Sequence, residues 1–141
     1  MITSIFIGLI GFSNLANAAK ILAIDDSATV LEITTKYLAE IGYADVVLAE
    51  NGKIALQELK EGNIDIIIID WNMPAMNSLT FVKRIRSGSY ASIPILMMTS
   101  TIEKEDLVEA LQNGVNNYIT KPFTTESLKI KMDLLLKSIQ K

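Results

Sequence analysis

Residues 64–70 read Ile-Asp-Ile-Ile-Ile-Ile-Asp, and the isoleucines at 66–69 leave no polar position on either side of a strand. A strand with one solvent-exposed face alternates polar and apolar residues, whereas a parallel strand that helices cover on both faces is apolar throughout. This stretch therefore predicts a central strand of a parallel sheet over residues 64–69, followed at once by the carboxylate of Asp70.

The segments on either side alternate between strand and helix. Short apolar runs predict four further strands, at 21–24, 45–49, 93–98 and 117–120. Apolar residues at helical spacing predict helices at 30–41, 51–62, 79–87, 103–112 and 124–138. Five βα units predict an α/β fold of the flavodoxin-like doubly wound class, (βα)5, whose five-stranded parallel sheet has the order 2-1-3-4-5.

The composition narrows the chemistry. The 141 residues include no cysteine and no histidine, which excludes disulfides, thiol nucleophiles, imidazole catalysis and the common zinc sites. The net charge is −3 and no basic stripe is present, which argues against a general nucleic-acid binder. Carboxylates, hydroxyls, lysines and an oxygen-preferring metal remain as the carriers of chemistry.

The first 19 residues differ from the remainder. Residues 5–12 are apolar and Ala16-Asn17-Ala18 has the form of a signal-peptidase site, yet no Lys or Arg precedes the apolar run and it is too short to span a bilayer. A mis-assigned start or vestigial extension, a genuine signal and an added helix packed on the domain are the three interpretations. We favour the first, because the chemistry expected of residues 20–141 needs a donor molecule from the cytoplasm. We therefore expect an extension, 1–19, and one cytoplasmic domain, 20–141, without stable membrane insertion.

Polar side chains stand at the carboxyl ends of the predicted strands, which converge on one crevice in a doubly wound fold. They are Asp25 and Asp26 after the first strand, Asp70 after the third, Thr99 at the end of the fourth and Lys121 after the fifth. Three carboxylates in one place repel one another unless cations compensate. Mg²⁺ prefers oxygen ligands, Lys121 adds an ammonium group, and the Thr99 hydroxyl can donate to a phosphoryl oxygen.

These groups together predict phosphoryl transfer, in which positioning and charge neutralisation supply most of the catalysis. Asp70 is the predicted nucleophile because it ends the most buried strand, and Asp25 and Asp26 are predicted to hold the metal. Taken singly, the residues have ordinary interpretations as a helix cap, a solvated strand end, a strand threonine and a surface lysine. Their joint occurrence at successive strand ends favours the chemical interpretation.

Four stretches carry a resemblance to a known family: Ile-Asp-Asp-Ser at 24–27, Asp-Trp-Asn-Met-Pro at 70–74, Ile-Pro-Ile-Leu-Met-Met-Thr at 93–99 and Tyr-Ile-Thr-Lys-Pro-Phe at 118–123. From residue 20 to about 141 the chain resembles response-regulator receiver domains. The resemblance implies that Asp70 accepts a phosphoryl group from a histidine kinase. It also implies that Mg²⁺ lies among Asp25, Asp26, Asp70 and the backbone carbonyl of Asn72.

The resemblance assigns three further roles. Lys121 would contact the phosphoryl group and precede a cis peptide bond to Pro122, and Thr99 and Tyr118 would form a switch pair. The implied function is that of a signalling phosphoacceptor rather than an enzyme, in chemotaxis signalling to the flagellar motor. The implied partners are a CheA-like histidine kinase, a phosphatase, and a target bound through the fourth helix, the fifth strand and the fifth helix.

Two alternatives share this chemistry, namely a phosphorelay intermediate and a shuttle for another sensory kinase. A third belongs to another class, a Mg²⁺-dependent phosphohydrolase. That enzyme would need a second carboxylate two residues beyond the nucleophile, where this chain has Asn72, and a cap domain for which there is no sequence. A phosphate-independent pseudo-receiver is disfavoured because all the site residues are present.

The chain departs from the family where Asn77-Ser78 replaces the common Asp-Gly. Glycine permits a positive φ, so we expect strain at Ser78 unless Asn77 takes up the turn geometry.

The last predicted helix carries apolar residues on two faces. The stripe expected to face the sheet is Leu128, Met132, Leu135 and Ile139. Ile130 and Leu134 lie on another face, either as isolated exposed residues or as a docking patch beside Tyr118.

Overall fold

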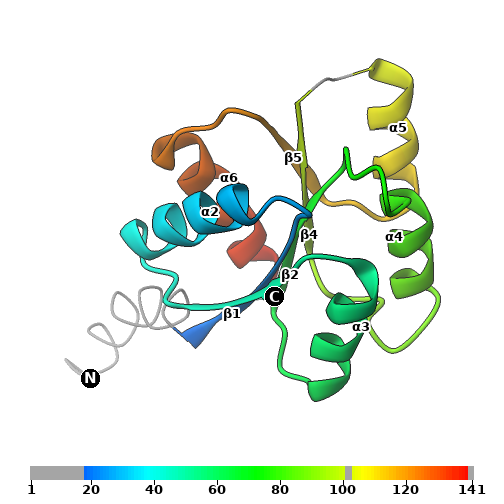
Figure 1. Cartoon of the computed structure of the whole chain (residues 1–141), viewed down its shortest axis with the longest axis horizontal. Coiled ribbons are helices and arrows are strands. Elements are labelled where there is room, and N and C mark those ends of the chain that lie inside the picture. The colour runs from blue at the N-terminus through cyan, green and yellow to red at the C-terminus, as the bar shows by residue number, and fades with distance from the viewer. Residues whose placement is uncertain (1–17, 101–102, 140–141) are drawn as a thin grey trace.

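A five-stranded parallel sheet lies between two layers of helices in the computed structural model, which describes residues 18–100 and 103–139 (Figure 1). The strands are β1 (Lys20–Ile24), β2 (Asp45–Ala49), β3 (Ile66–Asp70), β4 (Ile95–Thr99) and β5 (Asn117–Thr120). The helices are α2 (Ala28–Glu40), α3 (Gly52–Glu61), α4 (Ser78–Arg86), α5 (Lys104–Gln112) and α6 (Thr125–Ile139). The strand order is β2-β1-β3-β4-β5, which confirms the predicted doubly wound topology.

Two strands begin later than the sequence predicted. The Ile93 N–H donates to the Tyr90 carbonyl in a turn and Pro94 has no N–H, so β4 begins at Ile95. Asp65, which the sequence placed inside the central strand, precedes β3. Its carboxylate accepts the Lys20 N–H at 2.8 Å, at the start of β1. Both strands end where the sequence predicted chemistry, β3 at Asp70 and β4 at Thr99.

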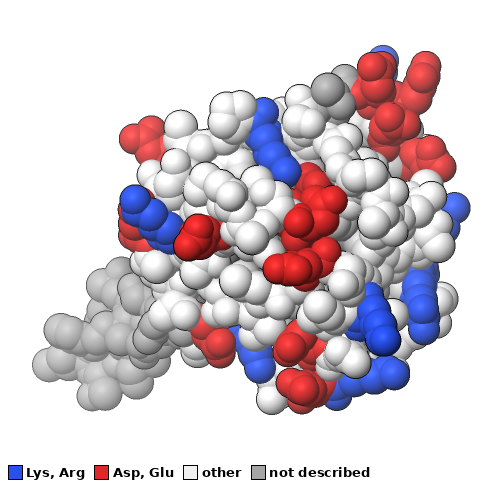
Figure 2. All heavy atoms as spheres, viewed as in Figure 1, with Lys and Arg blue, Asp and Glu red and all other residues white. Residues whose placement is uncertain are grey.

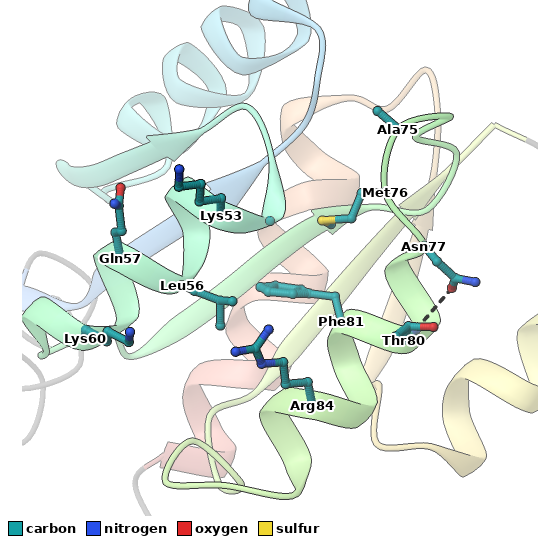
Figure 3. A pocket seen from close by; sticks show the side chains of 11 residues that line it. Lys53, Leu56, Gln57, Lys60, Ala75, Met76, Asn77, Thr80, Phe81 and Arg84 are labelled. Carbon is teal, nitrogen blue, oxygen red and sulfur yellow. Dashed lines mark hydrogen bonds between the residues drawn. The ribbon is translucent and has the colours of Figure 1, made fainter.

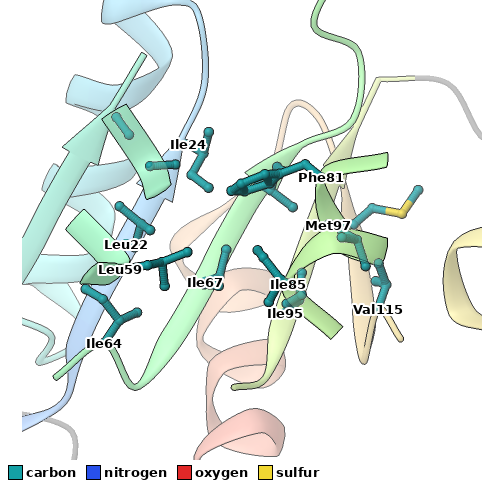
Figure 4. Close-up of a cluster of buried hydrophobic side chains, with 14 of the residues drawn as sticks. Leu22, Ile24, Leu59, Ile64, Ile67, Phe81, Ile85, Ile95, Met97 and Val115 are labelled. Atoms are coloured by element: carbon teal, nitrogen blue, oxygen red, sulfur yellow. The ribbon is translucent and has the colours of Figure 1, made fainter. Parts of the chain in front are cut away.

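The isoleucines of β3 belong to two separate hydrophobic clusters, one on each face of the sheet. Ile67 packs toward α3 and α4 (Figure 4) and Ile69 belongs to the same cluster, whereas Ile66 and Ile68 pack toward α2 and α6. All four are fully buried, and each such side chain contributes about 1.5–3 kcal/mol relative to an exposed one. The prediction of a strand covered on both faces is confirmed, and this rigid strand carries Asp70.

The inward face of α6 differs from the predicted stripe at its last position. Leu128, Met132 and Leu135 are buried as predicted, but Ile139 is 37% exposed and Leu136 is buried in its place. The prediction of burial for Ile139 was wrong although the helical period keeps position 139 on the same face as Leu128. Ile139 is the last residue of α6 and lines a surface pocket with Ile64 and Pro94, so part of its side chain stays open to solvent.

The N-terminal extension lies outside the described residues except for its last two. Ala19 is 5% exposed and packs in the cluster that contains Ile21 and Leu38. Across residues 18–100 and 103–139, no helix combines the length and the apolar content needed to cross a membrane.

Candidate functional site

The acidic cluster of Asp25, Asp26 and Asp70 lies at the carboxyl ends of β1 and β3. One carboxylate oxygen of each residue lies within 4.8 Å of the others. Asp25 and Asp70 are 1% and 3% exposed, whereas Asp26 is exposed. The structure thus brings together the three carboxylates that the sequence predicted to converge. Hard oxygen donors, two fixed by burial and one open to water, fit a cation such as Mg²⁺ that retains several waters.

Lys121 links the two buried carboxylates. Its Nζ lies 2.8 Å from Oδ1 of Asp70 and 3.2 Å from Oδ2 of Asp25. The residue follows β5, so the sheet brings the ammonium group across from the far edge, and the Lys121-Pro122 peptide bond is cis as the resemblance implied. A single mobile cation therefore neutralises part of the charge of a buried carboxylate pair.

Burial and the charges of the site shift the pKa values of Asp25 and Lys121. Burial raises the pKa of the Asp25 carboxyl, the Asp70 charge raises it further, and the Ser27 N–H and Lys121 partly offset them. Burial alone would lower the pKa of Lys121, but the hydrogen bond and charge of Asp70, followed by those of Asp25, outweigh burial and raise it. The ammonium group is thus held in its charged form. A further positive charge nearby would stabilise the ionised form of Asp25.

The side chain of Asn72 ties the loop after β3 to the end of β4. Its Oδ1 accepts the Thr99 hydroxyl at 3.2 Å, the Ser100 N–H at 3.1 Å and the Ser100 hydroxyl at 3.3 Å. Sequence reasoning considered only the backbone carbonyl of Asn72 and missed this side-chain role. The amide two residues beyond Asp70 was visible in the sequence, but its partners depend on the loop conformation.

Ser78 also has a role that the sequence did not reveal. It is 3% exposed at the start of α4, and its hydroxyl donates a 2.8 Å hydrogen bond to the backbone carbonyl of Asp70. The expected strain is absent, because Asn77 has φ −83° as the N-cap and accepts the Thr80 N–H, and Ser78 has no positive φ. The sequence allowed for Asn77 to take up the turn; it does so as an N-cap, and neither residue needs a left-handed conformation.

Tyr118 lies close to Thr99 on the neighbouring strand. It pairs in register with Met97, two residues before Thr99, so the two predicted switch residues share one face of the sheet. The Nζ of Lys131 on α6 lies 4.9 Å from the centroid of the Tyr118 ring and donates to Asn117 Oδ1 at 3.1 Å. This cation–π contact holds the half-buried ring, and the sequence did not predict it.

A comparison with models of known protein families identifies the family of this chain. A model described as the response regulator receiver domain matches residues 21–133. The chain belongs to this family. As a receiver domain it is a signalling phosphoacceptor rather than a catalytic enzyme. Membership of the family implies a cognate histidine kinase. The acidic cluster is typical of receiver-domain metal sites.

Known relatives of this receiver domain include chemotaxis proteins. It is 46% identical over 120 residues to chemotaxis protein CheY1 of Helicobacter pylori, covering 83% of the chain and 96% of the relative. It is 39% identical over 121 residues to CheY-3 of Vibrio cholerae, covering 85% and 93%. The solved structure of chemotaxis protein CheY4 of Vibrio cholerae superimposes with a TM-score of 0.78 at 36% identity, covering 83% and 98%. The receiver domain is therefore CheY-like in sequence and fold.

Proposed function

We propose that a histidine kinase phosphorylates this receiver domain on Asp70 with Mg²⁺, and that the protein is a cytoplasmic regulator of chemotaxis. The observation that carries the proposal is the Lys121 ammonium group 2.8 Å from Asp70, within a cluster of three carboxylates at one sheet edge. Its similarity to chemotaxis proteins of two organisms supports the cellular role.

In the proposed transfer, a carboxylate oxygen of Asp70 attacks the phosphorus of a phosphohistidine. The phosphorus–nitrogen bond breaks, the imidazole leaves, and an acyl phosphate forms on Asp70. Asp25, Asp26, Asp70 and the backbone carbonyl of Asn72 would hold Mg²⁺, which when bound supplies positive charge to the phosphoryl oxygens. Lys121 would move its ammonium group from the Asp70 carboxylate to a phosphoryl oxygen, because the negative charge moves there.

The switch would act through Thr99 and Tyr118. A phosphoryl oxygen on Asp70 is a charged acceptor, so it competes with Asn72 for the Thr99 hydroxyl. As Thr99 moves inward, the Tyr118 ring would follow on the same face of the sheet. The output face would comprise α5, β5 and α6, where Ile130 and Leu134 are 62% and 49% exposed. A partner bound there responds to phosphorylation only if it binds the two states with different affinity.

Labelling with acetyl phosphate in Mg²⁺ tests the proposed chemistry. The wild type should gain one phosphoryl group, removable by hydroxylamine, whereas Asp70→Asn should gain none and keep its fold. A relay or shuttle role for another sensory kinase would give the same labelling, so transfer from purified chemotaxis kinase measures the cellular role separately. Undiminished labelling of Asp70→Asn would place the acceptor elsewhere.

Residues 1–19 are proposed to lie outside the phosphorylation unit, since no site residue precedes Asp25. Ala19 packs in the core, so a chain that begins at Ala18 removes residues 1–17 and leaves this packing intact. It should accept the phosphoryl group at the rate of the full chain, and a folded but unlabelled product would assign the extension a part in the reaction.

A further inference from the structure

A groove of about 620 Å³ runs between α3 and α4, and none of its lining residues belongs to the acidic cluster or to the proposed output face (Figure 3). Each helix presents one face to it, at positions 53, 56, 57 and 60 of α3, and at the N-cap 77 and positions 80, 81 and 84 of α4. This is the i, i+3, i+4, i+7 spacing of one helix side. The groove is therefore formed by two matched helix faces, each two turns long.

The floor of the groove is apolar. Leu56 from α3 and Phe81 from α4 point toward each other, and Met76 lies beside them (Figure 3). Met76 can approach the start of α3 because residue 52 is glycine, where a Cβ would lie 2.6 Å from the methionine sulfur. Leu56 and Met76 are only half-buried, so an apolar side chain placed here would cover surface that water now contacts.

The rim of the groove carries three charges of one sign. Lys53, Lys60 and Arg84 line it and are exposed, and no Asp or Glu is among its described lining residues. This contrasts with the net charge of −3 of the whole chain. Figure 2 shows lysine and arginine side chains over α3 and α4 and acidic side chains gathered over α5; α3 also carries Glu58 and Glu61, which do not line the groove. The groove is thus a basic region on an acidic protein.

We propose that this groove binds an acidic segment of a partner protein. One or two apolar side chains of the segment would lie on Leu56, Met76 and Phe81, with carboxylates on either side facing the rim. Lys53 and Lys60 are seven residues apart, which is about 10 Å along a helix. That distance matches two turns of a bound helix, whose anchors follow the same spacing as the groove. Charge complementarity favours an acidic partner over a neutral one.

The helix starts argue against a phosphate group as the ligand. Asn51 Oδ1 accepts the Ile54 N–H at 2.8 Å, and Asn77 Oδ1 accepts the Thr80 N–H at 3.1 Å. Both N-termini are thus already capped by side chains, and the rim cations lie along the groove rather than at one point. A phosphate site needs converging donors, whereas carboxylates distributed along a peptide need spaced cations.

The test selects peptides from a phage library of random 12-residue sequences on the full-length wild-type chain. Selected peptides should combine Leu, Phe or Trp with flanking Asp or Glu, and should shift backbone amide signals of α3 and α4 in the wild-type NMR spectrum. Lys60→Glu/Arg84→Glu should weaken binding of the selected peptide about tenfold or more, since each reversed rim charge turns attraction into repulsion. Lys36→Glu/Lys137→Glu makes the same change in net charge on α2 and α6, and should alter binding less than twofold.

Several results would overturn the proposal. Enrichment of neutral or basic peptides, no enrichment, or amide shifts confined to other elements would each do so. A dimer of the wild type that the groove variant abolishes in sedimentation would identify a second copy as the occupant instead. Equal labelling of Asp70 in wild type and groove variant checks that the variant is folded. If the variant does not fold, the amide shifts of the wild type still show whether the peptide binds at the groove.

Discussion

The Thr99 hydroxyl donates a 3.2 Å hydrogen bond to Oδ1 of Asn72, which lies two residues beyond Asp70 in the chain. The same oxygen accepts the N–H and hydroxyl of Ser100. In the proposed switch the Thr99 hydroxyl turns to a phosphoryl oxygen, so Asn72 stabilises the position that Thr99 must leave.

Asn72→Ala should therefore favour the phosphorylated conformation. The change removes the competing acceptor and keeps the backbone carbonyl that is proposed as a metal ligand. Loss of a hydrogen bond worth about 1 kcal/mol should tighten beryllofluoride binding about fivefold in a titration followed by Trp71 fluorescence. Ser100→Ala is the matched control, because it leaves the Thr99–Asn72 bond in place. Weaker beryllofluoride binding in Asn72→Ala would contradict this role.

Asp26→Ala should weaken Mg²⁺ binding at least tenfold while leaving the free energy of unfolding equal or higher. The exposed carboxylate is part of the acidic cluster, so its removal loses one ligand and relieves repulsion from Asp25 and Asp70. Mg²⁺ titration of Trp71 fluorescence and urea unfolding measure the two effects. Glu32→Ala removes an exposed acid of α2 outside the cluster and should change neither. A normal Mg²⁺ titration of Asp26→Ala would remove this residue from the metal site.

Ser78→Ala should lower the free energy of unfolding by about 1–2 kcal/mol, because the carbonyl of Asp70 loses a buried donor. Alanine retains the helix start, so the loss measures the hydroxyl rather than the backbone. Urea unfolding gives the value, and Leu79→Ala, at the half-buried neighbouring position of α4, serves as a comparison for truncation without loss of a hydrogen bond. Unchanged stability of Ser78→Ala would show that water replaces the hydroxyl.

The sequence predicted the positions of the strand ends better than the contacts between them. Four consecutive isoleucines locate β3, and the topology of parallel strands then brings Asp25, Asp70 and Lys121 to one edge. The bond from Thr99 to Asn72 could not be predicted, because it depends on the conformations of two loops. Ser78 illustrates the same limit, since the Asn77-Ser78 pair left open either strain at Ser78 or a turn at Asn77, and the structure shows Asn77 as an ordinary N-cap.

The proposed output face predicts a binding defect without a labelling defect. Ile130→Lys/Leu134→Lys places two charges where α6 exposes apolar side chains, so a partner that covers them should bind the phosphorylated form at least tenfold more weakly. Pull-downs with beryllofluoride-loaded protein measure the partner, and acetyl phosphate labelling of Asp70 should stay normal. Ile33→Lys/Leu48→Lys tests whether apolar exposure alone matters, since Ile33 lies on α2 and Leu48 on β2, outside the proposed output face. Equal recovery by the Ile130/Leu134 variant and the wild type would move the output face to other elements.

Tyr43 predicts a pH dependence of stability that is independent of the phosphorylation site. Its ring is 1% exposed and its hydroxyl has no hydrogen-bond partner among the described residues. Burial, with a smaller effect of the Asp133 charge, raises the pKa of the phenol from 10.0 to about 12. The folded state thus keeps a proton that the unfolded state releases above pH 10.

The free energy of unfolding should therefore be unaffected by Tyr43 below pH 10 and should fall by about 1.4 kcal/mol per pH unit between pH 10 and 12. Tyr43→Phe removes this slope, and at pH 7 it should be as stable as the wild type or more stable, because it also removes a buried hydroxyl without a partner. Thermal unfolding at pH 7 and pH 11 measures both effects. Tyr37→Phe, a half-buried tyrosine of α2, is the control for loss of a phenol. If Tyr43→Phe lost stability between pH 10 and 12 as steeply as the wild type, another group would be responsible for the alkaline transition.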